Sequence, residues 1–176
     1  MEIRGDAFPE PDGHAPAPGG PAVRPQPYEG TWRFTAPVRD SSVPRARHLV
    51  RDLLRRRGAP VSDELLHGLL LILSELVTNA VRHAALLSEE IGVEVAVGPD
   101  WVRIGVEDGH PYRPSAPPAD PAREHTGGRG LLLVEATVTE AGGIFEVHRT
   151  ASGGKVVWAV LPMGRRPAGG PGSPAR

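Results

Sequence analysis

The longest amphipathic segment of the chain is SDELLHGLLLILSELVTNAVRH, residues 62–83. Ser62 can cap a helix here, and Asp63 and Glu64 would occupy its first turn, where acidic side chains are favourable. The apolar residues recur with a helical period and form one broad face, which consists of Leu65, Leu66, Leu69, Ile72, Leu73, Leu76, Val77 and Ala80. The segment therefore predicts a long helix that buries one side against the rest of the fold.

A row of three polar residues runs along one edge of that apolar face. Glu75, Asn79 and His83 follow one another at intervals of four residues, so they lie on one stripe of the helix. Such a row can line a pocket, or it can be the hydrated flank of an ordinary helix. Spacing alone favours the hydrated flank.

Upstream of this segment, the sequence predicts a strand and a first helix. Trp32 and Phe34 alternate with polar residues in a short strand over residues 31–35. A helix follows, capped by Ser41 or Ser42 and stopped by Gly58, with a periodic apolar set of Val43, Ala46, Val50, Leu53 and Leu54. Arginines gather near its end, either as a basic patch for a partner or, more commonly, as a solvated helix end.

Downstream, the sequence predicts two hairpins separated by a loop and a helix. Alternating apolar residues place strands at 91–97 and about 102–106, joined by a turn at residues 98–100, and further strands at 144–150 and 155–161. Between the hairpins, eight of the 20 residues in 109–128 are glycine or proline, which is typical of a lid, a binding loop or a disordered segment. With a helix over 131–140, the order predicts an α+β two-layer sandwich, a mostly antiparallel sheet with helices packed on one face.

Composition limits the classes of function. The Pro/Gly-rich ends predict flexible, disordered tails at residues 1–30 and 164–176 around a domain at 31–163. The absence of cysteine excludes disulfides, thiol catalysis and cysteine-ligated metal centres. A formal charge of −1 provides no general attraction to nucleic acid or to a membrane surface. Because we find no secretory start and no long apolar run, we expect a cytoplasmic protein.

A glycine-rich turn, Gly127-Gly128-Arg129-Gly130, directly precedes the apolar run that begins at Leu131. Such a turn exposes backbone N–H groups at the positive end of a helix, which suits a phosphate. On its own this is a weak signal, because the string matches neither the P-loop nor the dinucleotide fingerprint.

Three segments occur in a specific order: ELVTNAVRH at 75–83, EDGHPY at 107–112 and GGRGLLLVEA at 127–136. Together with a closing GGKVVWAVLP at 153–162, they resemble the histidine-kinase/Hsp90-like (GHKL) ATPase superfamily, whose ATP-binding domain has the Bergerat fold. The similarity spans about residues 31–163 and is strongest to small actinobacterial relatives of anti-sigma-factor serine kinases. The ordered combination is far more specific than any single segment.

The resemblance implies roles for individual residues. Asn79 would coordinate Mg²⁺ beside the triphosphate of ATP, and Glu75 would orient or deprotonate the attacking hydroxyl. Asp108, with Gly109 beside it, would accept a hydrogen bond from the exocyclic amine of adenine. His83 would face the phosphates or, more commonly for such a residue, be a satisfied or half-exposed histidine.

The resemblance also implies a phosphate-binding end formed by Gly127, Gly128, Arg129, Gly130 and Leu131, under a lid made by residues 109–126. Arg129 would either clamp a phosphate or point into solvent. The sequence departs from the family pattern at His110, which replaces a glycine, and residues 110–126 hold five prolines and no glycine. We therefore expect a stiff lid and a weakened affinity for adenine.

The implied function is that of an ATP-binding regulatory protein, a serine/threonine protein kinase of the anti-sigma-factor type that uses ATP and Mg²⁺. Its partners would be a small antagonist of an anti-sigma factor, a sigma factor, or both, and it would regulate transcription. The alternative is a nucleotide-responsive binding module without useful catalysis, for which the altered aspartate motif is the reason. The first helix can serve a homodimer. Zinc binding by His83, His110, His125 or His148 is disfavoured because these residues lack ligand spacing.

Overall fold

A computed structural model describes residues 26–84, 87–111 and 128–164. The predicted tails lie largely outside these residues, and so does the predicted lid beyond Pro111. The elements in chain order are β1 (Gly30–Pro37), α1 (Ser42–Arg57), α2 (Asp63–Ala84), β2 (Glu90–Val97), β3 (Trp101–Asp108), α3 (Gly128–Glu140), β4 (Ile144–Arg149) and β5 (Lys155–Pro162).

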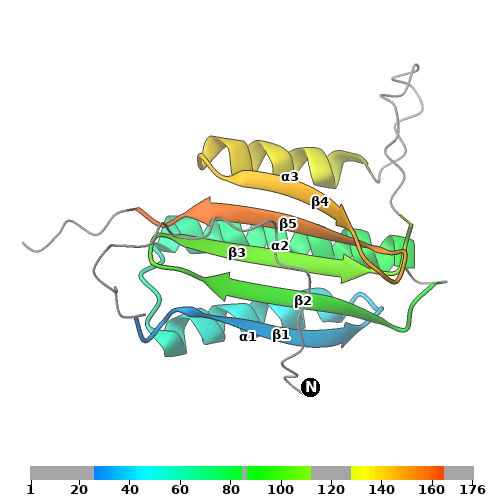
Figure 1. Cartoon of the computed structure of the whole chain (residues 1–176), viewed down its shortest axis with the longest axis horizontal. Helices are drawn as coiled ribbons and strands as arrows, with labels where there is room; N and C mark the ends of the chain where they lie inside the picture. Colours follow the sequence, from blue (N-terminus) through cyan, green and yellow to red (C-terminus); the bar gives the residue numbers. More distant parts are fainter. Residues whose placement is uncertain (1–25, 85–86, 112–127, 165–176) are drawn as a thin grey trace, which may run out of the picture.

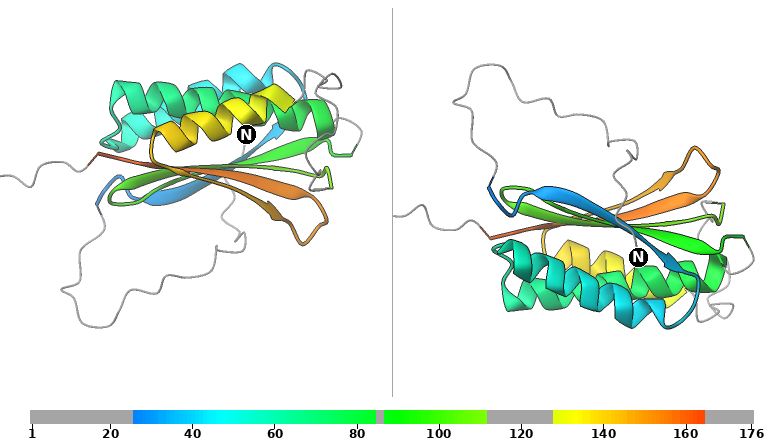
Figure 2. Two further views of the ribbon diagram at one scale, coloured as in Figure 1. Left: turned by 90° about the horizontal axis from the view of Figure 1, so that it is seen from above. Right: turned by 90° about the horizontal axis from the view of Figure 1, so that it is seen from below.

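The five strands form one antiparallel sheet in the order β1-β2-β3-β5-β4 (Figure 1). All three helices cover the same face of this sheet (Figure 2). The predicted α+β two-layer sandwich is therefore confirmed. The connection from β3 runs through α3 and β4 before the chain returns as β5, which inserts between β3 and β4.

Helix α2 lies at the centre of the core. Its residues Leu69, Ile72, Leu73 and Val77 are fully buried, and they belong to one cluster with the inward-facing residues of the sheet, among them Val93, Val95, Val102, Ile104, Val157, Ala159 and Leu161. By length and composition alone, α2 would pass as a membrane span, with 22 residues and a mean hydropathy of 1.4. Packing against the sheet accounts for this apolar character, because burial of one face is what a core helix requires.

The helix ends match the sequence prediction in part. The Leu65 N–H donates to Ser62 Oγ over 3.1 Å, so Ser62 caps α2. Gly58 ends α1 in the left-handed conformation, with φ of 66°. The predicted serine cap of α1 is not formed, because Ser41 makes no capping hydrogen bond and Ser42 Oγ donates to the Pro37 carbonyl instead, over 2.6 Å.

The opposite face of the sheet carries a charged and aromatic row. Glu94 is buried between two guanidinium groups, Arg33 Nε at 2.5 Å and Arg103 Nη2 at 2.9 Å. The Arg103 guanidinium also stacks over the Trp158 ring, 4.4 Å from its centroid. These contacts compensate the desolvation of Glu94 on the face that the helices leave open.

Candidate functional site

Four elements bring the predicted site residues to one end of the sheet. Strand β3 and helix α2 end there, whereas β5 and α3 begin there (the right-hand side of Figure 1). The antiparallel pairing of β3 with β5 sets Asp108, the last residue of β3, opposite Lys155, the first residue of β5. Residues far apart in the sequence therefore meet at this end.

The polar row of α2 lies along this end of the fold. Glu75 and Asn79 are half-buried and His83, one turn further, is exposed. Within the described residues, neither the Glu75 carboxylate nor the Asn79 amide has a hydrogen bond or ion pair. Their oxygens are the kind of ligand that Mg²⁺ accepts, commonly one or two from the protein beside phosphate and water.

Glu75 lies against the first turn of α3. The contact is made at Gly130, where an added Cβ would stand 2.6 Å from Glu75 Oε2. The missing side chain of Gly130 therefore provides the space that the carboxylate occupies. Gly128 and Arg129 also belong to α3, which begins three residues earlier than the sequence predicts. Leu131 follows in the helix and is half-buried.

Asp108 is a buried carboxylate held by two donors. The Lys155 ammonium donates to Asp108 Oδ1 over 3.0 Å, and the backbone N–H of His110 donates to the same oxygen over 2.8 Å. The Asp108 and Lys155 side chains are only 2% and 9% exposed. Gly154 allows the start of β5 to pack closely against the end of β3, because a Cβ at this position would lie 2.3 Å from the Asp108 carbonyl oxygen.

Two histidines stand next to this buried pair. The rings of His83 and His110 meet edge to face, with centroids 5.6 Å apart. Although His83 is exposed as a residue, partial desolvation of its ring lowers the pKa, and the positive charge of Lys155 and the neighbouring His110 lower it further, against an opposing effect of Asp108. The imidazole of His83 is therefore neutral at neutral pH, which limits electrostatic repulsion of Lys155.

Some predicted residues lie outside the described structure. Gly127, His125 and the Arg129 side chain are among them, so their predicted roles stay predictions. Gly109 is exposed directly after Asp108. The residue that sequence reasoning missed is Lys155, and two signals pointed to it: it is the only lysine among 20 basic residues, and it follows two glycines at the start of a strand.

The donor set of this end fits a nucleotide and a magnesium ion. Asp108 offers acceptors to a base, and Glu75 and Asn79 offer oxygens beside the amino end of α3, whose partial positive charge attracts phosphate. Gly130 keeps that helix end close to Glu75. The arrangement can place an anionic ligand, a cation and a proton acceptor next to one another.

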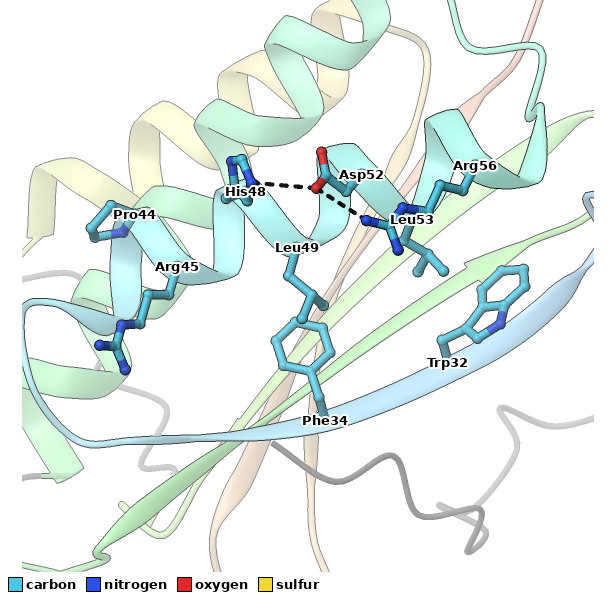
Figure 3. Close-up of a pocket in the computed structure, with 9 residues that line it drawn as sticks. All are labelled: Trp32, Phe34, Pro44, Arg45, His48, Leu49, Asp52, Leu53 and Arg56. Atoms are coloured by element: carbon cyan, nitrogen blue, oxygen red, sulfur yellow. Dashed lines mark ion pairs between the residues drawn. The ribbon is translucent and has the colours of Figure 1, made fainter.

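A second feature, a groove of about 590 Å³, lies between α1 and β1 at the far edge of the sheet (Figure 3). Trp32 and Phe34 of β1 point toward α1, where Leu49 meets the Phe34 ring and His48, Asp52 and Arg56 form ion pairs along the helix. The full lining consists of Trp32, Phe34, Pro44, Arg45, His48, Leu49, Asp52, Leu53 and Arg56. None of these residues belongs to the motifs at the end of the sheet.

Comparison with protein-family models identifies one family. A family model described as a histidine kinase-like ATPase domain matches residues 36–161. Among solved structures, the chain is similar to the histidine kinase domain of the Erythrobacter litoralis EL346 blue-light activated histidine kinase, with 19% identity and a TM-score of 0.45, over 72% of this chain and 61% of that one. The matched region thus spans less than two thirds of that domain. The histidine kinase domain of the E. coli osmosensor EnvZ is 26% identical, with a TM-score of 0.40, over 60% of this chain and 73% of that one. No curated protein matched the sequence.

Proposed function

Because this chain belongs to the histidine kinase-like ATPase family, we propose that it binds ATP with Mg²⁺ where α2, β3, α3 and β5 meet, and acts as a serine/threonine protein kinase of the anti-sigma-factor type. Its substrate would be a small antagonist protein, with a sigma factor as a further partner, and it would regulate transcription in the cytoplasm. The observation that supports this most is the position of Glu75, packed on the first turn of α3 at Gly130 and one helical turn from Asn79.

Each residue has a task that its chemistry allows. Asn79 would bind the cation through its amide oxygen, and the cation would neutralise charge on the phosphates. Glu75 would take the proton of the serine hydroxyl as its oxygen bonds to the γ-phosphorus, while the bond to the bridging oxygen breaks and ADP leaves with the electron pair. The amino end of α3 would hold the phosphates, and Asp108 would accept a hydrogen bond from the base.

Thermal unfolding with and without Mg–ATP tests the nucleotide site. Ligand at about a hundred times its Kd adds roughly 2.7 kcal/mol, which raises the Tm of a domain of this size by on the order of ten degrees. We expect this shift in the wild type, and we expect Asn79→Ala to lose it. His67→Ala, an exposed change on the same helix, serves as the matched control and should keep it. Absence of a shift in the wild type at millimolar ATP would refute nucleotide binding.

Transfer of labelled phosphate to the cognate antagonist tests the kinase. Glu75→Ala should abolish transfer and leave the ATP-dependent shift in Tm unchanged, because Glu75 acts on the hydroxyl and not on the base. If the wild type transfers nothing at any magnesium concentration while ATP still raises the Tm, the kinase proposal fails.

That last outcome would favour the second candidate, a nucleotide-responsive binding module. Two observations support it: His110 in place of the family's glycine, and the apolar groove between α1 and β1 that a protein partner or a second copy of the chain can fill. In this case ATP would change affinity for the partner without chemistry. Sedimentation with and without Mg–ATP would detect such a change for a homodimer.

A further inference from the structure

The groove between α1 and β1 has no task in the proposed nucleotide site. It has a volume of about 590 Å³, with Trp32 and Phe34 of β1 on one side and Leu49 and Leu53 of α1 on the other (Figure 3). A hollow of this size buries most of a drug-sized ligand, which corresponds to the side chains of a few residues. Trp32, Leu49 and Leu53 are only half-buried, so the groove keeps apolar surface open to a ligand.

The rim of the groove is basic. Helix α1 holds six arginines and one acidic residue, Asp52. Arg45 and Arg56 line the groove itself, and the guanidinium of Arg57 lies over the Trp32 ring, 5.0 Å from its centroid. An apolar floor with a cationic rim is complementary to a segment in which apolar side chains are accompanied by acids.

The chain before β1 contains a segment of this character. Residues 1–12 hold four acidic residues and one arginine. Among them, Phe8-Pro9-Glu10-Pro11-Asp12 joins two prolines and two acids to the only Phe, Tyr or Trp of the first 25 residues. Proline-rich segments favour the extended polyproline II conformation before they bind, so they lose little entropy on docking in a groove lined by aromatic rings.

The segment is tethered within reach of the groove. Tyr28 packs against the core just before β1, the strand that forms one wall of the groove. The connecting residues 13–25 span up to about 43 Å when extended, whereas a strand of eight residues such as β1 is only about 26 Å long. Such a tether gives an effective concentration on the order of 1 mM, at which a contact with a Kd of about 0.1 mM is about nine-tenths occupied.

We propose that residues 8–12 dock in the groove between α1 and β1 of their own chain. The Phe8 ring packs on the apolar floor, and Glu10 and Asp12 lie beside the arginines of the rim. The docked segment covers the apolar surface and takes the place that a protein partner would occupy. This inference goes beyond the proposed function and does not depend on nucleotide binding.

A spin label next to the segment tests the proposal in the full chain. The sequence has no cysteine, so Gly13→Cys accepts a single nitroxide directly after Asp12. A nitroxide broadens the NMR signals of nearby protons, and this effect falls steeply with distance. We expect the indole N–H signal of Trp32 to be lost, while the indole signals of Trp101 and Trp158 remain.

Trp101 and Trp158 are internal references because they lie on the other face of the sheet. The Arg103 guanidinium lies over both rings there, 6.0 Å and 4.4 Å from their centroids. Their strands, β3 and β5, are the second and third neighbours of β1, and adjacent strands are about 4.8 Å apart. A label in the groove is therefore closest to Trp32.

Phe8→Ser separates docking from the nearness of a tethered tail. A tail that is only tethered brings the label near Trp32 whichever residue occupies position 8. If the segment docks through Phe8, the substitution should restore the Trp32 signal. Val23→Ser, between the segment and β1, is the matched control and should leave the signal lost. Neither position belongs to the buried core of the described residues, so both variants keep the fold.

Each outcome decides for or against the proposal. Loss of the Trp32 signal that Phe8→Ser reverses supports it. A Trp32 signal that persists in the labelled chain, or that is lost equally in Phe8→Ser, overturns it. A mixture of spin-labelled chain with isotope-labelled chain identifies the origin of the segment. Loss of the Trp32 signal in this mixture would show that a second copy supplies the segment and would overturn docking within one chain, whereas a retained signal supports it.

Discussion

Asp108 lies in an almost dry position, where two donors replace hydrogen bonds to the water that its side chain has lost. Removing one partner from a buried ion pair typically costs about 3–5 kcal/mol, because the remaining charge is left without compensation. Lys155 and the His110 N–H meet this requirement at one oxygen of the carboxylate. Asp108 is therefore held in one orientation, and under the proposed function this would lower the entropic cost of binding a base.

A pH dependence follows from His83 at the same scale. Its pKa lies below the ordinary value of 6.5, first because of burial and then because of Lys155 and His110. The unfolded chain therefore binds the proton more readily than the folded one. The contribution of His83 to stability is complete above pH 6.5 and is lost as the pH falls through the unfolded and then the folded pKa.

We accordingly expect acidification to lower the Tm of the wild type more than that of His83→Gln. Melting curves between about pH 7.5 and pH 5.5 measure the difference, and this range brackets the titration of a histidine. His67→Gln, on an exposed position of the same helix, should follow the wild type. If the Tm falls equally with pH in the wild type and in His83→Gln, the titration of His83 does not contribute to the pH dependence of stability.

At the scale of elements, the first turn of α3 combines a poor helix former with a close contact. Alanine is favoured over glycine by about 1 kcal/mol inside a helix. At Gly130, however, a Cβ would stand 2.6 Å from Glu75 Oε2. Glycine at position 130 therefore lowers the helix propensity of α3 but leaves the space in which Glu75 packs against this helix.

Gly130→Ala should consequently keep or slightly raise the free energy of unfolding, while phosphoryl transfer falls at least tenfold as Glu75 is displaced. Gly68→Ala in α2 is the matched control, because its Cβ would meet only Thr137 Cγ2 at an ordinary 3.9 Å. The free energy of unfolding of this control should rise by about 1 kcal/mol, and its activity should be unchanged. Denaturant unfolding and a transfer assay on both variants give the comparison. Full activity in Gly130→Ala would show that the position of Glu75 is not critical.

At the scale of the whole molecule, the buried core extends from Phe34 to Met163, with Tyr28 and Trp32 packed against it. We therefore propose that residues 31–163 form the domain and expect a chain without residues 1–25 to keep a cooperative melt, with a Tm within a few degrees of the full length. Calorimetry measures this. A chain that begins at residue 38 loses β1 with Trp32 and Phe34, and it should fail to melt cooperatively. Loss of cooperativity in the shorter truncation would assign the first 25 residues a part in the core.

The sequence alone determined the elements and their buried faces. Helical periodicity over residues 62–83 defined α2, and alternation defined both hairpins to within a few residues, although β1 proved longer than predicted. These features are local, because the face on which a residue lies depends only on its neighbours along the chain. The polar row of Glu75, Asn79 and His83 could be located in this way, but periodicity left open whether it lines a site.

Only the tertiary structure decided what that row meets. The insertion of β5 between β3 and β4 brings Lys155 to Asp108 from 47 residues away, and the packing of α3 on α2 brings Gly130 to Glu75. A local pattern does not specify which strands become neighbours. Strands with the same alternation of apolar and polar residues could exchange places in the sheet and still bury the same face. The neighbours are decided when all apolar faces of the chain are buried together, and this arrangement places Lys155 beside the Asp108 carboxylate.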